Sequence, residues 1–127
     1  MIAAGVGFRS GAGAAEIAAL VREAEKRAGV RAGDLAVLAT IDDRAAEQAF
    51  VEAAAMLAIP AASVGQEEAQ GASARVATRS NRVLARYGVG SVAEAAALWA
   101  AGEESRLVLP RIASAKVTCA LAEGAGR

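Results

Sequence analysis

Short apolar runs alternate with stretches of helical spacing along the first half of this chain. The runs have the length of strands, and the stretches between them repeat alanine and aliphatic residues every three or four positions. This strand-helix-strand-helix-strand order favours an α/β fold with a parallel sheet and right-handed crossovers. The expected strands are residues 2–8, 35–41 and 61–64, and the expected helices have an apolar stripe over residues 17–28 and a span of residues 44–58.

The second half of the chain predicts one firm helix and a closing strand pair. Residues 91–101 have a single apolar face, and Gly102 ends the pattern. Residues 106–109 and 116–122 resemble strands, and the loop at residues 110–115 allows them to pair antiparallel, which would give a mixed, mainly parallel sheet. Weaker patterns predict a helical turn at residues 66–69, a loop at 71–78 and a short helix at 80–86.

Length and charge bound the class of protein. The 127 residues suit one compact domain, and no apolar run is long enough to span a membrane although 55% of the residues are hydrophobic. Basic and acidic residues number 14 each, which argues against a nucleic-acid surface. We expect one α/β domain at residues 1–122 with helices on both faces of the sheet, a frayed tail at 123–127, and a cytoplasmic protein without nucleic-acid or membrane partners.

The absence of histidine and the single cysteine remove several chemistries. Without histidine there is no Ser-His or Cys-His nucleophilic pair and no His-ligated metal site. Cys119 alternates with Val117 and Leu121 on one strand face, which is typical of a buried, inert thiol. The sequence therefore predicts neither a metal site nor a cofactor, and it leaves acid-base chemistry to carboxylates.

Glycines surround the turn that follows the first expected strand. Gly7, Gly11 and Gly13 either make a tight turn into the helix or let the backbone approach a ligand. The dinucleotide-binding pattern is not met, because Ser10 stands where its third glycine would be. A small nucleotide- or phosphate-binding domain stays open on this loop alone. The groups best placed to contact a ligand are Gly7, Arg9, Ser10 and Gly11.

Charged residues follow the second expected strand. Asp42 or Asp43 suits the N-cap of the next helix, and Glu47 suits the positive end of its dipole. The alternative is functional: Asp42 or Glu47 serves as an acid-base or ligand-anchoring group, and Arg44 binds a carboxylate beside Thr40.

A capping box opens the helix at residues 91–101. Ser91 and Glu94 have the capping-box spacing, and Gly88 and Gly90 form the turn before them. Glycines in front of a helix N-terminus are also an anion site, so both roles can coexist. Four arginines between residues 75 and 86 form either a solvated helix face or a docking surface for carboxylates or phosphates.

Four motifs in a fixed order carry a family resemblance between residues 2 and 122. They are Gly5, Gly7, Arg9 and Gly11; Thr40, Ile41, Asp42, Arg44 and Glu47; Gly88 through Ala96; and Pro110, Arg111, Val117, Thr118 and Ala120. In this order and spacing the chain resembles the family formed by the CobE proteins and the C-terminal domain of CbiG, both of cobalamin biosynthesis. Arg44 and Arg111 stand where the family pattern has lysine, so both are assigned to binding.

The resemblance implies a protein that acts on, or holds, a precorrin or corrin tetrapyrrole, with other cobalamin-biosynthesis enzymes as further partners. CbiG is associated with opening a lactone on a cobalt-containing, ring-contracted tetrapyrrole. The chain lacks the N-terminal region of CbiG and is more similar to CobE of the oxygen-dependent route, so a hydrolase-like step is not carried over directly. A non-catalytic carrier of a labile intermediate is the alternative.

The tetrapyrrole implied by the resemblance carries acetate and propionate side chains, which arginines and helix N-termini can bind. The expected acid-base residues are Asp42, Glu47 and Glu94. The expected substrate-binding residues are Gly7, Arg9, Ser10, Gly11, Thr40, Arg44, Gly90, Ser91 and Arg111.

Overall fold

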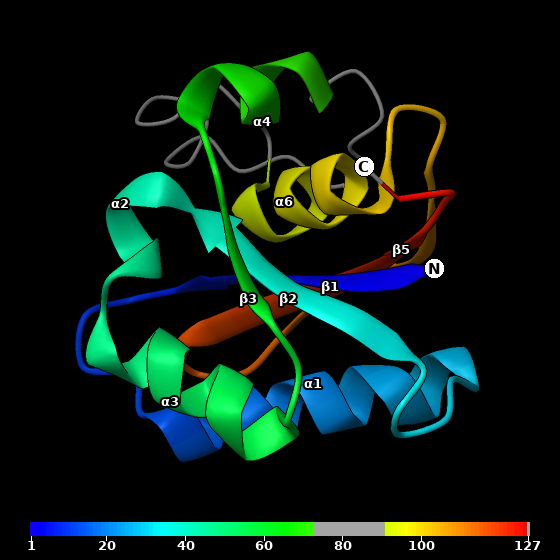
Figure 1. Ribbon diagram of the computed structural model, residues 1–127. Helices are drawn as coiled ribbons and strands as arrows, with labels where there is room; N and C mark the ends of the chain where they lie inside the picture. The colour runs from blue at the N-terminus through cyan, green and yellow to red at the C-terminus, as the bar shows by residue number, and fades with distance from the viewer. Residues whose placement is uncertain (73–90, 127) are drawn as a thin grey trace.

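The computed structural model describes residues 1–72 and 91–126 as one layered α/β domain (Figure 1). The strands are β1 (Ile2–Phe8), β2 (Leu35–Ile41), β3 (Ala61–Val64), β4 (Arg106–Ala113) and β5 (Val117–Glu123). The helices of the described residues are α1 (Ala14–Ala28), α2 (Asp42–Ala45), α3 (Gln48–Leu57), α4 (Gln66–Ala72) and α6 (Val92–Ala101). The arginine stretch at residues 75–86, the helix expected at 80–86, Gly88 and Gly90 lie outside the described residues.

The five strands form one sheet in the order β3-β2-β1-β5-β4. β1, β2 and β3 are parallel, and β5 runs antiparallel to both β1 and β4, so four of the five strands point the same way. Helices α1 and α3 cover one face of the sheet, and α4 and α6 cover the other (Figure 1). The predicted fold, a mixed and mainly parallel sheet with helices on both faces and a C-terminal antiparallel pair, is confirmed.

The single helix expected at residues 44–58 is two helices, α2 and α3. Glu47 has an extended backbone, with φ of −68° and ψ of 137°, which breaks the helix. Neither Asp42 nor Asp43 is an N-cap, because both lie inside α2 and Ile41 precedes it without a side-chain cap. The capping interpretation of these two aspartates is therefore wrong.

The loop expected at residues 110–115 is mostly strand. β4 continues through Pro110 and Arg111 to Ala113. Its pairing with β5 shifts between Leu109 and Ile112, and this irregularity contains the proline. A proline has no N–H for a ladder, and an edge strand with a bulge is where a sheet accepts one.

The frayed tail expected at residues 123–127 is held in place over the part that the structure describes. Glu123 belongs to β5. The Gly124 N–H donates to the Met1 carbonyl at 3.0 Å, and the Met1 amino group donates to the Gly124 carbonyl at 2.6 Å. The Gly126 N–H donates to the Ala101 carbonyl at 2.8 Å. Small residues such as glycine and alanine give no sign of such backbone hydrogen bonds, so the sequence could not predict that this segment is fixed.

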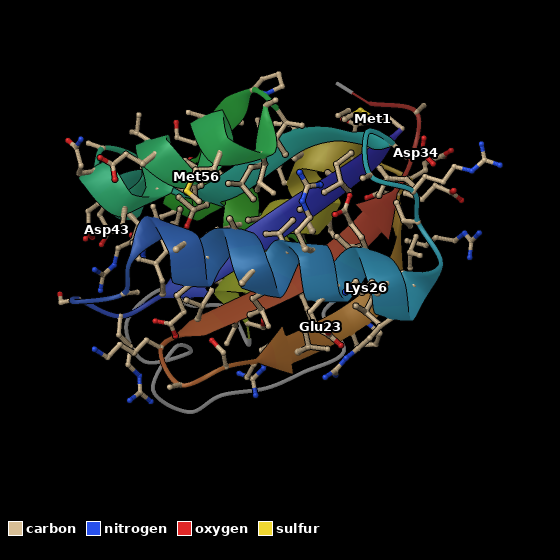
Figure 2. The ribbon with its side chains drawn as sticks, turned by 90° about the horizontal axis from the view of Figure 1, so that it is seen from below. Met1, Glu23, Lys26, Asp34, Asp43 and Met56 are labelled. Atoms are coloured by element: carbon tan, nitrogen blue, oxygen red, sulfur yellow. The ribbon has the colours of Figure 1, made fainter. Side chains whose placement is uncertain are left out.

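The carboxyl ends of β1, β2 and β3 define one edge of the sheet, which we call the carboxyl edge. The turn after β1 and helix α2 both lie there, away from the chain termini (Figure 1). Figure 2 shows Asp43 of α2 at this end of the molecule and Met1 and Asp34 at the other. β5 begins at the same edge, because Val117 pairs with Phe8. None of the described helices is long and apolar enough to span a membrane.

Candidate functional site

The turn after β1 exposes a basic and a polar side chain at the carboxyl edge. Arg9, Ser10 and Gly11 are all exposed. The Arg9 N–H donates to the Lys116 carbonyl at 2.9 Å, and the Arg9 carbonyl accepts from the Ala12 N–H at 3.1 Å. Gly11 has a φ of 90°, a left-handed conformation that strains any other residue. The backbone of this turn is thus fixed, and its side chains face solvent.

Gly7 is a glycine for reasons of packing. A Cβ at this position would lie 2.8 Å from Thr118 Oγ1 and 3.6 Å from the Cβ of Val92. The Thr118 hydroxyl also donates to the Gly7 carbonyl at 3.3 Å. These contacts bring the end of β1, the start of β5 and the N-terminal turn of α6 together.

Thr40 lies inside the sheet, away from any open surface. Its side chain is fully buried, and its hydroxyl donates to the Val6 carbonyl at 2.7 Å. The bond ties β2 to β1 just before both strands end. Thr40 therefore holds two strands together, whereas contact with a ligand would require an exposed side chain.

Arg44 and Glu47, expected as binding and acid-base residues, form an ion pair. Arg44 Nη1 lies 2.6 Å from Glu47 Oε2. The guanidinium also lies over the Phe8 ring, 5.6 Å from its centroid, and Phe8 stacks on Phe50. Asp42 is exposed at the start of α2. Arg44 is thus held beside the end of β1, and its positive charge is partly compensated by the Glu47 carboxylate.

The N-cap half of the capping box is present at the start of α6. Ser91 Oγ accepts from the Glu94 N–H at 3.3 Å. Ser91 and Glu94 are both buried, and Glu94 Oε2 accepts from the Arg111 N–H at 2.9 Å. A bond from a charged acceptor is stronger than a neutral one, so Glu94 fixes the irregular part of β4 against the first turn of α6.

The four expected motifs meet around the carboxyl edge wherever the structure describes them. Phe8 and Arg44 join the first turn to α2, Gly7 and Val92 join β1 to α6, and Glu94 and Arg111 join α6 to β4. Gly90 lies outside the described residues. The motifs are far apart in sequence, and the sheet order brings them to one end of the molecule.

Lys116 also belongs to this edge and was missed by the sequence reasoning. Its Nζ lies 3.5 Å from the position that a Cβ on Gly11 would occupy. The chain has two lysines, Lys26 and Lys116, so rarity was an available signal. Its place beside the first turn depends on β5 pairing with β1, which spacing alone did not predict.

Charge pairing differs between the carboxyl edge and the rest of the described molecule. Elsewhere Arg22, Arg27 and Arg106 each pair with a glutamate. Within residues 1–72 and 91–126, the side chains of Arg9, Arg111 and Lys116 form no ion pair or hydrogen bond. The edge therefore presents three cations that have no ion-pair partner among the described residues, beside the exposed Asp42 and Asp43, and such cations are suited to anions.

Cys119 is buried under α1, as the strand alternation predicts. Burial raises the pKa of its thiol from 9.0 to about 12, and the Glu25 carboxylate contributes in the same direction. The thiol is therefore protonated at neutral pH and is not a nucleophile.

The chain matches a known protein family over most of its length. Residues 2–122 match the family described as "Cobalamin synthesis G C-terminus". Protein CobE of Sinorhizobium sp is 41% identical over 118 residues, which cover 93% of this chain and 77% of that protein.

Solved structures of the same group share the fold. The crystal structure of CobE, from the cobalamin (vitamin B12) biosynthetic pathway, matches with a TM-score of 0.91 at 27% identity, over 100% of this chain and 92% of that chain. Cobalamin biosynthesis protein chiG from Agrobacterium tumefaciens str. C58 matches with a TM-score of 0.78 at 40% identity, over 98% and 99%. The chain belongs to the cobalamin synthesis G C-terminal family, as CobE-like proteins do, and is a protein of cobalamin biosynthesis.

Proposed function

We propose that the protein binds a precorrin or corrin intermediate of cobalamin biosynthesis at the carboxyl edge of its sheet. The observation that supports this most is the set of cations there that form no ion pair among the described residues, namely Arg9, Arg111 and Lys116. Away from this edge, most of the described arginines pair with a glutamate. Precorrins carry acetate and propionate carboxylates, which guanidinium groups bind with charge-assisted hydrogen bonds. The site therefore matches the chemistry of the ligand that the family implies.

Each binding residue has its own place in this proposal. Arg9 and Ser10 are exposed on a fixed turn. Arg111 is positioned through its backbone by Glu94. Arg44 contributes after its pair with Glu47 rearranges, because one guanidinium edge already holds that carboxylate. The glycine-turn amides and the Ser91 end of α6 supply partial positive charge.

A carrier that holds the intermediate is favoured over an enzyme by the state of the carboxylates. Glu47 pairs with Arg44, Glu94 accepts a backbone N–H, and Asp42 stands exposed at the start of α2. Glu47 and Glu94 are thus already engaged as acceptors, whereas an acid-base mechanism needs groups within reach of the transferred proton. A hydrolase-like step, with these residues as acid or base, is the second candidate.

The test is a visible-absorbance titration with a panel of precorrins and corrins that carry free carboxylates, followed by product analysis. A saturable shift without a new product supports the carrier, and a new product supports the enzyme. We expect Arg9→Ala and Arg111→Ala to weaken binding about tenfold each, because each removes a charged hydrogen-bond donor. Arg44→Ala weakens it less.

Arg106→Ala is the matched control, since Arg106 lies on the same strand as Arg111 but pairs with Glu123. It is expected to bind like the wild type. Folded Arg9→Ala, Arg44→Ala and Arg111→Ala proteins that all bind normally would contradict the proposal. Binding of an isolated nucleotide but of no corrin would favour the phosphate-binding alternative. The place in the oxygen-dependent route is tested by restoring cobalamin synthesis in an aerobic host that lacks its own CobE.

A further inference from the structure

Arg9 and Lys116 stand directly opposite each other where β1 and β5 meet the carboxyl edge. The antiparallel ladder pairs Gly7 with Thr118 and ends with Phe8 and Val117. The next step places Arg9 across from Lys116, and the Arg9 N–H donates to the Lys116 carbonyl at 2.9 Å. Residues opposite each other in such a pair have Cβ atoms about 5 Å apart, and like charges there repel.

The alternation of the two strands places this pair on the α6 side of the sheet. Phe8 and Val117 belong to the core under α1. The preceding pair, Gly7 and Thr118, faces α6, as the short approach of Gly7 to Val92 shows. Continuing the period of two past the ends of both strands assigns Arg9 and Lys116 to the α6 side of the sheet.

The usual compensation for such a pair is missing from the part of the chain that the structure describes. Glu16 is the acidic residue that contacts this turn, and its Oε2 accepts from the Lys116 backbone N–H at 3.2 Å and from the Ser114 hydroxyl at 3.1 Å. Glu16 thus holds the turn between β4 and β5 through a backbone N–H and a hydroxyl. Within residues 1–72 and 91–126, no carboxylate pairs with either the Arg9 guanidinium or the Lys116 ammonium.

We infer that Lys116, with Arg9, is a ligand-binding pair that clamps one carboxylate side arm of the tetrapyrrole. This inference rests on the proposed function and adds a residue to its site. A carboxylate between the two cations converts their mutual repulsion into two attractions, and it accepts from both.

The experiment measures the affinity of the full-length protein for two probes, cobyrinic acid and its fully methylated ester. The ester keeps the ring and removes every carboxylate charge. Binding of cobyrinic acid is followed by absorbance at low and at moderate salt for the wild type, Lys116→Ala, Lys116→Arg and Lys116→Glu. Lys26→Ala is the matched control, because Lys26 is the other lysine and lies in the last turn of α1 (Figure 2).

We expect Lys116→Ala to weaken cobyrinic acid binding about fivefold, and Lys116→Glu more strongly. Lys116→Arg keeps the charge and is expected to stay close to the wild type. The ester is expected to bind equally to all variants, and the salt dependence is expected to fall in Lys116→Ala. Lys26→Ala is expected to match the wild type.

The outcomes separate this inference from the proposed function. Unchanged cobyrinic acid binding by Lys116→Ala and Lys116→Glu overturns the role of Lys116 and leaves the proposed function standing. Equal losses in Lys116→Ala and Lys26→Ala also overturn it, because they indicate a general charge effect. Failure of the wild type to bind cobyrinic acid overturns this inference, and failure with every precorrin and corrin of the panel, or displacement by inorganic phosphate at equal concentration, overturns both.

Discussion

The two faces of the sheet are packed in opposite ways. On the α1 and α3 side the buried residues are large, including Ile17, Leu20, Phe50 and Leu57. On the α6 side they are mostly alanine, and Gly5 of β1 lies against the backbone of α6 at Ala93 and Ala97. Large side chains can change rotamer when a neighbour changes, but two backbones in direct contact cannot adjust in this way. The α6 side therefore fixes the position of the helix, and with it the part of the candidate site at the N-terminus of α6.

Each face also buries one glutamate, and the two are used differently. Glu25 of α1 is 3% exposed and pairs only with Arg22, one turn away on its own helix, in the contacts described. Glu94 of α6 is 0% exposed and accepts from the Arg111 N–H of β4, 17 residues further along the chain. A buried charge is costly, so a long-range partner indicates a positional role and a local one does not. The comparison predicts different consequences of substitution on the two sides.

The largest effect is expected from a methyl group at the tightest contact. In Gly5→Ala the new Cβ would overlap the Ala93 carbonyl and lie 2.5 Å from the Ala97 N. Because both are backbone atoms, α6 must move, and we expect a loss of about 4 kcal/mol or more in the free energy of unfolding. Urea denaturation measures it. Gly13→Ala is the control, since nothing lies within 4 Å of its Cβ position, and a loss below about 1 kcal/mol is expected.

A smaller effect is expected at the buried carboxylate of the α6 side. Glu94→Ala leaves the Arg111 N–H without its acceptor, and we expect a loss of about 2–3 kcal/mol in the free energy of unfolding. Glu94→Gln keeps an oxygen acceptor and should recover about half of that loss. Amide hydrogen exchange at Arg111 is the direct measurement, with faster exchange in Glu94→Ala than in Glu94→Gln. Equal exchange in both variants and the wild type would show that Glu94 does not hold this strand.

The fold was predictable because local patterns determined it. The apolar run of β1 gave the correct bounds of that strand, and Gly29 after the apolar stripe gave the correct end of α1. Pro110 misled, since a proline ends most strands but fits the shifted pairing of an edge strand. Spacing alone could not reveal that bulge, because it depends on which strand lies at the edge.

For the candidate site, the sequence could predict which motifs would meet but not how each side chain would be placed. Loops at the ends of parallel strands had to meet, which brought Arg9, Arg44 and Glu94 to one edge. Whether a side chain there is exposed, paired or buried depends on distant contacts. Thr40 is thus bonded inside the sheet, and Lys116 joins the first turn through the pairing of β1 with β5.

The buried thiol of the α1 side should make the folded protein less stable as the pH rises above 9. The pKa of Cys119 is raised from 9.0 to about 12 in the folded protein. Below pH 9 the thiol is protonated in both states, whereas above it only the unfolded thiol loses its proton. Its contribution to stability is therefore lost between pH 9 and about 12, by about 1.4 kcal/mol per pH unit.

The measurement compares the wild type with Cys119→Ala in urea denaturation from about pH 8 to about pH 10.5. Packing differences between the two proteins are the same at every pH, so only the slope difference reports the thiol. Parallel pH dependences in the two proteins would show that the folded pKa of Cys119 is not raised.

The smallest expected effect, and the one with opposite sign, is at the second buried glutamate. Among the described contacts Glu25 Oε2 has no hydrogen-bond partner, while Arg22 is 43% exposed and can return to water. Glu25→Met removes the unsatisfied oxygen and fills similar volume, so we expect a gain of about 1 kcal/mol in the free energy of unfolding. The same change should lower the pKa of Cys119, to which Glu25 contributes.

Glu23→Met is the control on the same helix, because Glu23 forms an exposed pair with Arg27 and should change stability by less than about 0.5 kcal/mol. A clear loss of free energy of unfolding in Glu25→Met, with none in the control, would mean that Glu25 also stabilises the structure through its charge. The two faces of the sheet would then differ only in their packing.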